Sequence, residues 1–303
     1  MEKSFMTNYE PTFLQTDLKA KSEEALEFLK DCQLCPRKCK VDRLKGEVGY
    51  CQTGRWAIVS SYGPHFGEEP VLVGTGGSGT IFFAHCNLKC CFCQNYDISH
   101  LGHGEVTKAD ELANMILALQ KMGCHNINLV SPSHVVAQFI EALAIAKEKG
   151  LHLPIVYNSG GYDSISTLKF LEGVIDIYMP DAKYSNSDFA EKYSSASKYF
   201  EINQLAMKEM HRQVSDLLTD NNGVTLKGLI IRHLVLPNRI AGSFEVLKFI
   251  AEKISKDTYV NIMLQYRPCY HANQYLKISR NITRQEYQEV IEFAEKIGLH
   301  RGF

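Results

Sequence analysis

Short apolar segments that alternate with helical patterns restrict the fold of this chain more than any other feature of its sequence. We expect strands at residues 79–85, 126–131, 154–159, 175–182, 229–236 and 260–266. Repeated strand–helix units produce a parallel sheet, and their right-handed crossovers can curl that sheet into a full or partial barrel. The predicted fold class is therefore α/β, a partial (β/α)6 barrel of parallel strands.

The helical patterns carry apolar residues on one face and recognisable start signals. Helices are expected at residues 21–31, 107–122, 134–148, 165–172, 198–218, 243–255 and from 283 onward. Capping boxes are expected at Thr107 with Asp110 and at Thr283 with Glu286, and Gly298 should end the last helix. The acidic turn 67–70 could contribute an acid to the active site, but a solvated turn is the favoured interpretation.

Eight of the ten cysteines in this 303-residue chain fall into two groups. The groups are Cys32, Cys35, Cys39 and Cys51, then Cys86, Cys90, Cys91 and Cys93. The polar N-terminus does not resemble a signal peptide, so we expect a cytoplasmic protein, in which clustered cysteines usually bind metal or perform redox chemistry. The formal net charge of −1 argues against a general nucleic-acid binder, and no apolar run is long enough for a membrane span.

The second cysteine group begins directly after the first expected strand. Ligands of parallel α/β folds bind at the carboxyl ends of the strands, so this loop should lie on the functional edge. Cys86, Cys90 and Cys93 have the spacing C-x3-C-x2-C, with Phe92 just before the last cysteine. Three thiolates in one loop suit a cubane cluster and leave one metal position open, as a catalytic site requires.

With this loop, after the first of six strand–helix units, the sequence over residues 76–303 resembles the radical S-adenosylmethionine (SAM) superfamily. The resemblance implies a 4Fe-4S cluster on Cys86, Cys90 and Cys93, whose open iron is chelated by the amino and carboxylate groups of SAM. One electron from the cluster would cleave the sulfonium, and the resulting 5'-deoxyadenosyl radical would abstract hydrogen from a substrate. A structural zinc or disulfide loop is the alternative interpretation.

Within that superfamily the chain most resembles the glycyl-radical-enzyme activases, in particular homologues of the pyruvate formate-lyase activating enzyme. The supporting strings are CPRKC, GSGTIFFAHCNLKCCFCQN, NINLVSPSH, MPDAKYSN, IRHLVLPN and QYRP. The Gly-Gly-Glu that holds the SAM amino group in many relatives is absent after the second strand. Ser131, Ser133 or the local backbone are the expected replacements.

Other polar residues near strand ends are further candidates for the site. The resemblance implies SAM contacts for Asn158, Asp181 and Lys183, in addition to Phe92 in the cysteine loop. Arg232 lies inside an apolar strand, where a charge must be paired; its partner is either the SAM carboxylate or a structural salt bridge. Gln265 and Tyr266 end the last strand and face either the substrate or the barrel interior.

The first cysteine group belongs to a segment with little hydrophobic periodicity. Its four thiols could close a tetrahedral zinc site or hold a second iron–sulfur cluster, and the spacing does not distinguish the two. We therefore predict two units, a cysteine-rich N-terminal segment at 1–75 and a radical SAM domain at 76–303.

The predicted function is that of a radical SAM enzyme, an oxidoreductase resembling the pyruvate formate-lyase activating enzyme. The expected partners are a reductant such as flavodoxin or ferredoxin and a substrate that is a protein or a small metabolite. Two alternatives remain, a non-catalytic iron–sulfur electron carrier or sensor, and a zinc-stabilised interaction module built around residues 32–51.

Overall fold

The computed structural model describes residues 9–303, and its centre is a run of six parallel strands. They are β2 (Ser78–Phe83), β4 (Ile127–Val130), β5 (Ile155–Ser159), β6 (Ile177–Pro180), β8 (Thr225–Leu234) and β9 (Tyr259–Met263). Neighbours in this order pair in parallel. Among the described residues no pairing joins β9 back to β2, so the barrel is open on that side. The predicted partial barrel is confirmed.

The N-terminal part of the chain also contributes to the sheet. Strand β1 (Ala57–His65) runs antiparallel to β2, and β3 (Glu105–Thr107) runs antiparallel to β1; neither strand was expected. A short strand, β7 (Leu218–Thr219), pairs antiparallel with β8. The division at residues 75 and 76 stays a prediction, and the structure adds that the predicted N-terminal segment extends the same sheet.

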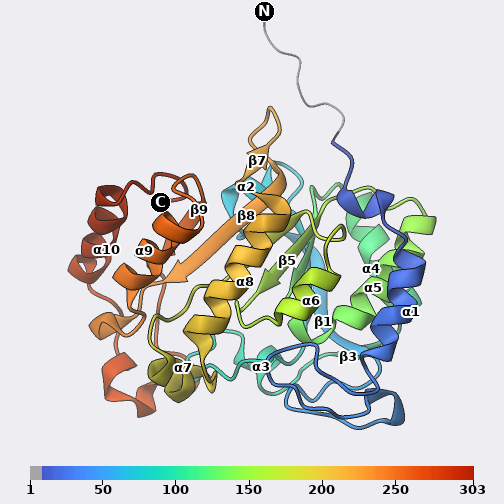
Figure 1. Cartoon of the computed structure of the whole chain (residues 1–303), viewed down its shortest axis with the longest axis horizontal. Helices are drawn as coiled ribbons and strands as arrows, with labels where there is room; N and C mark the ends of the chain where they lie inside the picture. Colours follow the sequence, from blue (N-terminus) through green and yellow to red (C-terminus); the bar gives the residue numbers. More distant parts are fainter. Residues whose placement is uncertain (1–8) are drawn as a thin grey trace, which may run out of the picture.

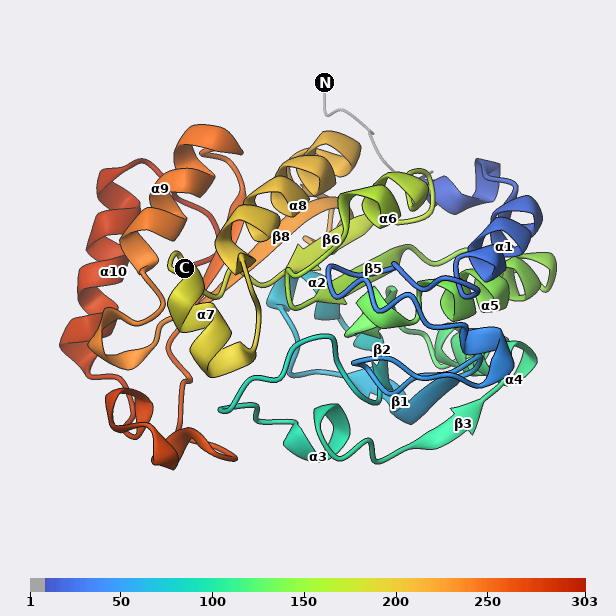
Figure 2. The same ribbon diagram turned by 60° about the horizontal axis from the view of Figure 1, so that its bottom comes forward.

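The longer helices cover the outer side of the sheet (Figures 1 and 2). The α-helices of the described residues are α1 (Leu18–Glu27), α2 (Pro70–Val73), α3 (Tyr96–Ser99), α4 (Ala109–Lys121), α5 (Val136–Glu148), α6 (Ile165–Phe170), α7 (Ser187–Ser194), α8 (Tyr199–Val214), α9 (Ser243–Lys253) and α10 (Arg284–Lys296). Helices α1, α4 and α5 gather at one end of the molecule and α9 and α10 at the other (Figures 1 and 2). None of the described helices is both long and apolar enough to cross a bilayer.

Two helix starts test the capping predictions. The box at Thr283 and Glu286 is confirmed, since each side chain accepts the backbone N–H of the other residue. The box at Thr107 is wrong by one position: Glu111 accepts the N–H of Lys108, and the Thr107 hydroxyl donates to the Glu105 carbonyl instead. The reason is that Thr107 is the last residue of β3, so the helix begins one residue later.

Short helix α2 closes the amino-terminal end of the barrel from inside. Leu72 is fully buried there against Val156, Ile177, Met179 and Ile230. Alternate strand residues, such as Ile155 and Tyr157, instead join the large outer core beneath the helices. Because α2 fills one end, the space inside the barrel is left at the carboxyl ends of the strands, toward which the β5 and β8 arrowheads point in Figure 1.

Acid should destabilise the fold through His233 on β8. Its Nδ1 lies 2.6 Å from the Ala182 carbonyl oxygen and its Nε2 lies 2.8 Å from the Ser243 hydroxyl. Burial lowers the pKa of His233 from 6.5 to about 4. Between those pH values the unfolded chain binds more protons than the folded one, so stability is lost as the pH falls from about 6.5 to about 4, by about 3 kcal/mol in total.

Denaturant unfolding of the wild type and of His233→Gln at a series of pH values measures this contribution. The variant should lose stability less steeply below pH 6.5. Identical slopes in the two proteins would show that His233 is not the group responsible.

Candidate active site

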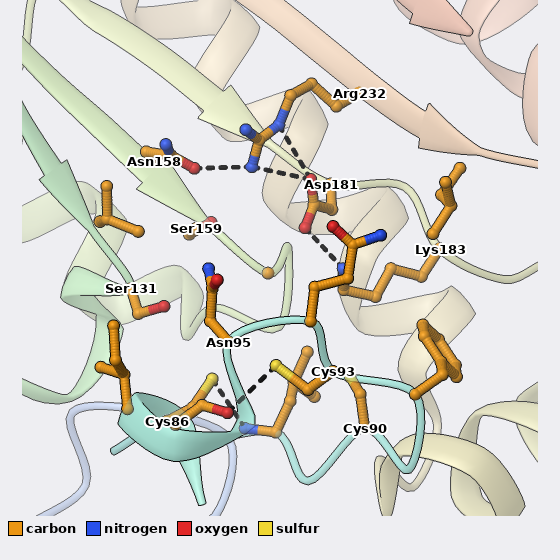
Figure 3. A pocket seen from close by; sticks show the side chains of 18 of the residues that line it. Cys86, Cys90, Cys93, Asn95, Ser131, Asn158, Ser159, Asp181, Lys183 and Arg232 are labelled. Carbon is orange, nitrogen blue, oxygen red and sulfur yellow. Dashed lines mark hydrogen bonds and ion pairs between the residues drawn. The ribbon is translucent and has the colours of Figure 1, made fainter. Parts of the chain in front are cut away.

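The cysteine loop and the carboxyl ends of the strands line one open cavity (Figure 3). Its empty space is about 1170 Å³ with the open mouth included. The predicted site residues that line it are Cys86, Cys90, Phe92, Cys93, Ser131, Asn158, Asp181, Lys183, Arg232, Gln265 and Tyr266. Residues at or just after the ends of β4, β5, β6, β8 and β9 thus meet the cysteine loop at the edge that the sequence analysis identified.

Ser133 is the one predicted cofactor residue that does not line this cavity. Its hydroxyl donates to Asp163 Oδ1 over 2.6 Å and is buried. Ser131 does face the cavity, and it adopts the left-handed backbone conformation with φ of 60°. A non-glycine residue held in that conformation stores strain and is often found at functional sites. Of the two serines, only Ser131 is placed to contact a ligand.

Three of the four cysteines in the loop line the cavity, and their sulfurs accept hydrogen bonds. The Leu88 N–H donates to Cys86 Sγ over 3.4 Å. The Ser194 hydroxyl donates to Cys90 Sγ over 3.0 Å, and the Ser99 hydroxyl donates to Cys93 Sγ over 3.1 Å. Such bonds stabilise negative charge on sulfur and tune the clusters that sulfur binds.

Cys91 has different surroundings from its three neighbours. It is buried in an apolar cluster that includes Tyr193 and Tyr266, and its backbone N–H donates to the Tyr193 carbonyl over 2.8 Å. It does not line the cavity. Cys91 therefore anchors the loop while Cys90 lines the site.

The thiols of Cys86 and Cys90 are protonated until a metal replaces the proton. Burial raises the pKa of the Cys90 thiol to about 12, although the nearby Lys183 ammonium acts in the opposite direction. Burial also raises the pKa of Cys86. Binding of a metal therefore releases protons, and Lys183 supplies positive charge beside the thiolates that form.

Arg232 is held in a buried polar network on the opposite wall of the cavity. Its Nε lies 3.0 Å from Asp181 Oδ1, its Nη2 donates to Asn158 Oδ1 over 2.7 Å, and its Nη1 is 3.5 Å from Glu68 Oε1. Burial opposes ionisation of Asp181, but the charges of Arg232 and Lys183 outweigh burial and hold its pKa below the ordinary value. The salt-bridge interpretation of Arg232 thus holds, and the same side chain also lines the cavity.

Tyr266 and Phe92 form one aromatic side of the cavity. Their rings meet edge to face with centroids 5.7 Å apart, and the Tyr266 hydroxyl donates to the Ile278 carbonyl over 2.6 Å. The backbone carbonyl of Gln265 accepts from the Gln94 amide over 3.3 Å. The Tyr266 hydroxyl therefore already has a hydrogen-bond partner, while Tyr266 also lines the cavity.

The acidic turn before α2 contributes acids to the site, which is the interpretation that the sequence analysis did not favour. Its predicted exposure is wrong: Glu69 is only 5% exposed, and its Oε1 accepts from Asn261 on β9 over 2.7 Å. Glu68 Oε2 accepts from Asn128 and Asn158 over 3.0 and 3.2 Å. Asparagines inside apolar strands were the available signal, because a buried amide needs a polar partner.

This turn forms the wall of a second cavity that continues the first. Both cavities are lined by Asn158, Arg232 and Gln265, while Glu68 and Glu69 line only the second. Since Glu69 bonds to β9 and its own turn follows β1, the turn crosses the open side of the barrel. Glu69 Oε2 is buried without a hydrogen-bond partner among the described residues, and burial raises the pKa of this carboxyl.

The four cysteines of the N-terminal group also come together, around a separate cavity. In the part of the chain that the structure describes, no three His, Cys, Asp or Glu side chains are grouped as ligands of a single metal ion. The two cysteine groups line separate cavities and therefore form two distinct sites.

Comparisons with known proteins agree with this geometry. The family model of the Radical SAM superfamily matches residues 80–228. An uncharacterized protein of Methanocaldococcus jannaschii is 33% identical over 292 residues, which cover 93% of this chain and 79% of that protein. The pyruvate formate-lyase-activating enzyme of Clostridium pasteurianum is 26% identical over 172 residues, covering 54% of this chain and 64% of that enzyme.

Among solved structures, a radical SAM methyltransferase from Sphaerobacter thermophilus is similar with a TM-score of 0.51 and 14% identity. The match covers 74% of this chain and 65% of that structure. At this level of identity the likeness concerns the fold alone.

Proposed function

Because the chain belongs to the radical SAM superfamily, we propose that it cleaves SAM reductively at a 4Fe-4S cluster and abstracts hydrogen from a substrate bound in the same cavity. The observation that carries the proposal is the meeting of three cysteine sulfurs and the polar strand-end residues in one open cavity. An electron carrier needs no such space, because its cluster exchanges electrons without binding a second ligand.

The residues present fit the cluster. Cys86, Cys90 and Cys93 would hold it, since each residue lines the cavity and its sulfur accepts a hydrogen bond. The cluster, when bound, supplies the electron that breaks the SAM sulfonium. The ammonium of Lys183, which also contacts Asp181 over 2.6 Å, offsets the negative charge of the thiolates.

The opposite wall would bind SAM without a Gly-Gly-Glu segment. Ser131 offers a hydroxyl at the end of β4, and the weak 3.5 Å contact to Glu68 leaves Arg232 Nη1 the best placed of its nitrogens for a carboxylate. The side-chain amide of Asn158 already donates a hydrogen bond to Glu68 and accepts one from Arg232. It therefore orients the guanidinium rather than binding the cofactor. Such preorganisation lowers the cost of binding a charged ligand.

The substrate we propose is a protein side chain or backbone position, as for an activase. Two observations support it: the similarity to the Clostridium pasteurianum enzyme, and the open mouth of the cavity. The reductant would be flavodoxin or ferredoxin.

Anaerobic reconstitution tests this function. The protein loaded with iron and sulfide, mixed with SAM and dithionite, should release 5'-deoxyadenosine and methionine. The variant with Cys86, Cys90 and Cys93 all changed to Ala is the control and should release neither. Failure of the unaltered protein to cleave SAM, with its cluster verified by spectroscopy, would contradict the proposal in favour of an electron carrier.

Ser194→Ala should lower the reduction potential of the catalytic cluster. The hydroxyl bond to Cys90 Sγ stabilises the more negative, reduced form, and its removal favours the oxidised form. A redox titration followed by electron paramagnetic resonance measures the shift. Ser187→Ala, on the same helix but bonded to Glu201, is a matched control that should leave the potential unchanged.

A further inference from the structure

The second cavity, beside the acidic turn, has more acidic than basic groups in its surroundings. Glu68 and Glu69 both line it, and Arg232 is the only Lys or Arg among the described residues that do so. Asp181 lies 3.0 Å from the Arg232 guanidinium and 2.6 Å from the Lys183 ammonium, whereas the contact between Arg232 and Glu68 is a weak 3.5 Å. Three carboxylates thus share two cations, and one negative charge has no partner.

Glu69 is the carboxylate that has no cation beside it. It is only 5% exposed, its Oε1 accepts from Asn261 over 2.7 Å, and its Oε2 has no hydrogen-bond partner among the described residues. No ion pair found in residues 9–303 includes it. Burial raises the pKa of Glu69, and the charges of Glu68 and Asp181 add to this effect. A buried carboxylate in this state needs both a donor and a positive charge.

The chemistry of this cavity selects among the groups that could enter it. An anion would be repelled by the two carboxylates, and an apolar group would leave the Glu69 oxygen without a donor. A neutral amide would supply the donor but not the charge. An ammonium or guanidinium group supplies both, through charge-assisted hydrogen bonds. The cavity volume of about 310 Å³ leaves room for more than a water molecule, so the end of a long side chain can enter.

The second cavity is continuous with the cavity that holds the cysteine loop. Asn95, Asn158, Arg232 and Gln265 line both, and Figure 3 shows Asn158 and Arg232 on this shared wall. A ligand whose cationic end lies at Glu69 therefore extends into the space where SAM would be cleaved. Binding energy from such a remote group can position the reacting part of a substrate.

We propose that the second cavity is a substrate subsite that binds a lysine or arginine side chain of the protein substrate, with Glu69 as the counter-charge and Glu68 beside it. The proposal rests on the proposed function, because it takes the substrate to be a protein. The position that loses hydrogen then lies close to this basic residue, since the two cavities adjoin. Glu69 is a specificity-determining residue in this arrangement.

Calorimetric titration of the full-length protein, purified anaerobically and measured without SAM or reductant, tests the proposal. The probes are N-acetyl-lysine amide, N-acetyl-arginine amide and the uncharged analogue N-acetyl-norleucine amide. Both cationic probes should bind at least about 10-fold more tightly than the norleucine probe, as expected for a hydrogen bond to a charged group.

Two variants locate the binding site. Glu69→Gln should lose the preference for cationic probes, because glutamine keeps the size of the side chain and an acceptor for Asn261 but carries no charge. Glu105→Gln is the matched control and should keep the preference, since Glu105 is exposed on β3 and does not line the cavity.

Equal affinities for the lysine and norleucine probes in the unaltered protein would overturn the proposal, and so would an undiminished preference in folded Glu69→Gln. If circular dichroism shows that this variant does not fold, Glu68→Gln replaces it. Glutamine at position 68 keeps an acceptor for Asn128 and Asn158, and the same loss of preference is expected. An unchanged preference in Glu68→Gln would then overturn the proposal.

n-Butylamine distinguishes a protein side chain from a free amine. Tighter binding of n-butylamine than of N-acetyl-lysine amide would overturn the assignment to a protein substrate. SAM cleavage by the unaltered protein is scored separately and without probes. Loss of probe binding and failure to cleave SAM are therefore independent results, so the failure of this subsite is distinguishable from the failure of the proposed function.

Discussion

Replacement of Cys90 by alanine should abolish SAM cleavage, whereas replacement of the adjacent Cys91 should leave it nearly unchanged. Cys90 lines the cavity and accepts a hydrogen bond from Ser194, while Cys91 is buried in the tyrosine-rich cluster behind the loop. Loss of a residue that merely supports a metal ligand already costs about 10–100-fold, so loss of the ligand itself should cost more than about 100-fold.

Iron content and 5'-deoxyadenosine yield in the two variants measure this difference. Cys91→Ala should retain both and lose only the packing of one small apolar side chain, about 1 kcal/mol of stability. Retention of the cluster in Cys90→Ala would overturn the ligand assignment. Equal losses in both variants would show that Cys91 is needed as well.

Asp181→Ala should destabilise the protein by about 3–5 kcal/mol, because it leaves two buried cations without their shared partner. Asp181 Oδ1 contacts Arg232 over 3.0 Å and its Oδ2 contacts Lys183 over 2.6 Å. Both cations lie mostly buried at the cavity, so water replaces the carboxylate poorly. SAM affinity should also fall, because Arg232 loses its fixed orientation.

Denaturant unfolding provides the measurement, and Glu172→Ala is a matched control. Glu172 pairs with Arg212 over 2.8 Å, but the two side chains are 53% and 51% exposed. Exposed ion pairs contribute about 0–1 kcal/mol, so the control should change stability little. Comparable small effects in both variants would mean that Asp181 does not neutralise the two cations as the structure indicates.

The strands and the cysteine loop were predictable because their signals are local. Each strand is a short apolar run, and the order of the parallel strands in the barrel follows their order in the chain. The prediction therefore did not have to decide which distant segments pair with one another. The position of Cys86 after β2, and of Asp181 after β6, then follows from the rule that ligands bind at strand ends.

Side-chain direction was less predictable, even for residues close in sequence. Ser131 and Ser133 are two positions apart at the same strand end, yet one faces the cavity and the other bonds to Asp163. A left-handed backbone at Ser131 turns the chain there, and no residue preference indicates that conformation in a serine.

The sequence by itself determined the parallel barrel, the catalytic cysteine loop and the pairing requirement of Arg232, because periodicity and spacing act between near neighbours along the chain. Only the tertiary structure decided what closes the open side of the barrel. The contact between Glu69 and Asn261 joins residues 192 positions apart, and it forms only after the strands are assembled. In the sequence, Glu69 lies in what looks like a solvated turn, but the contact with Asn261 buries its carboxylate. Burial depends on the packing of distant elements rather than on the residue itself.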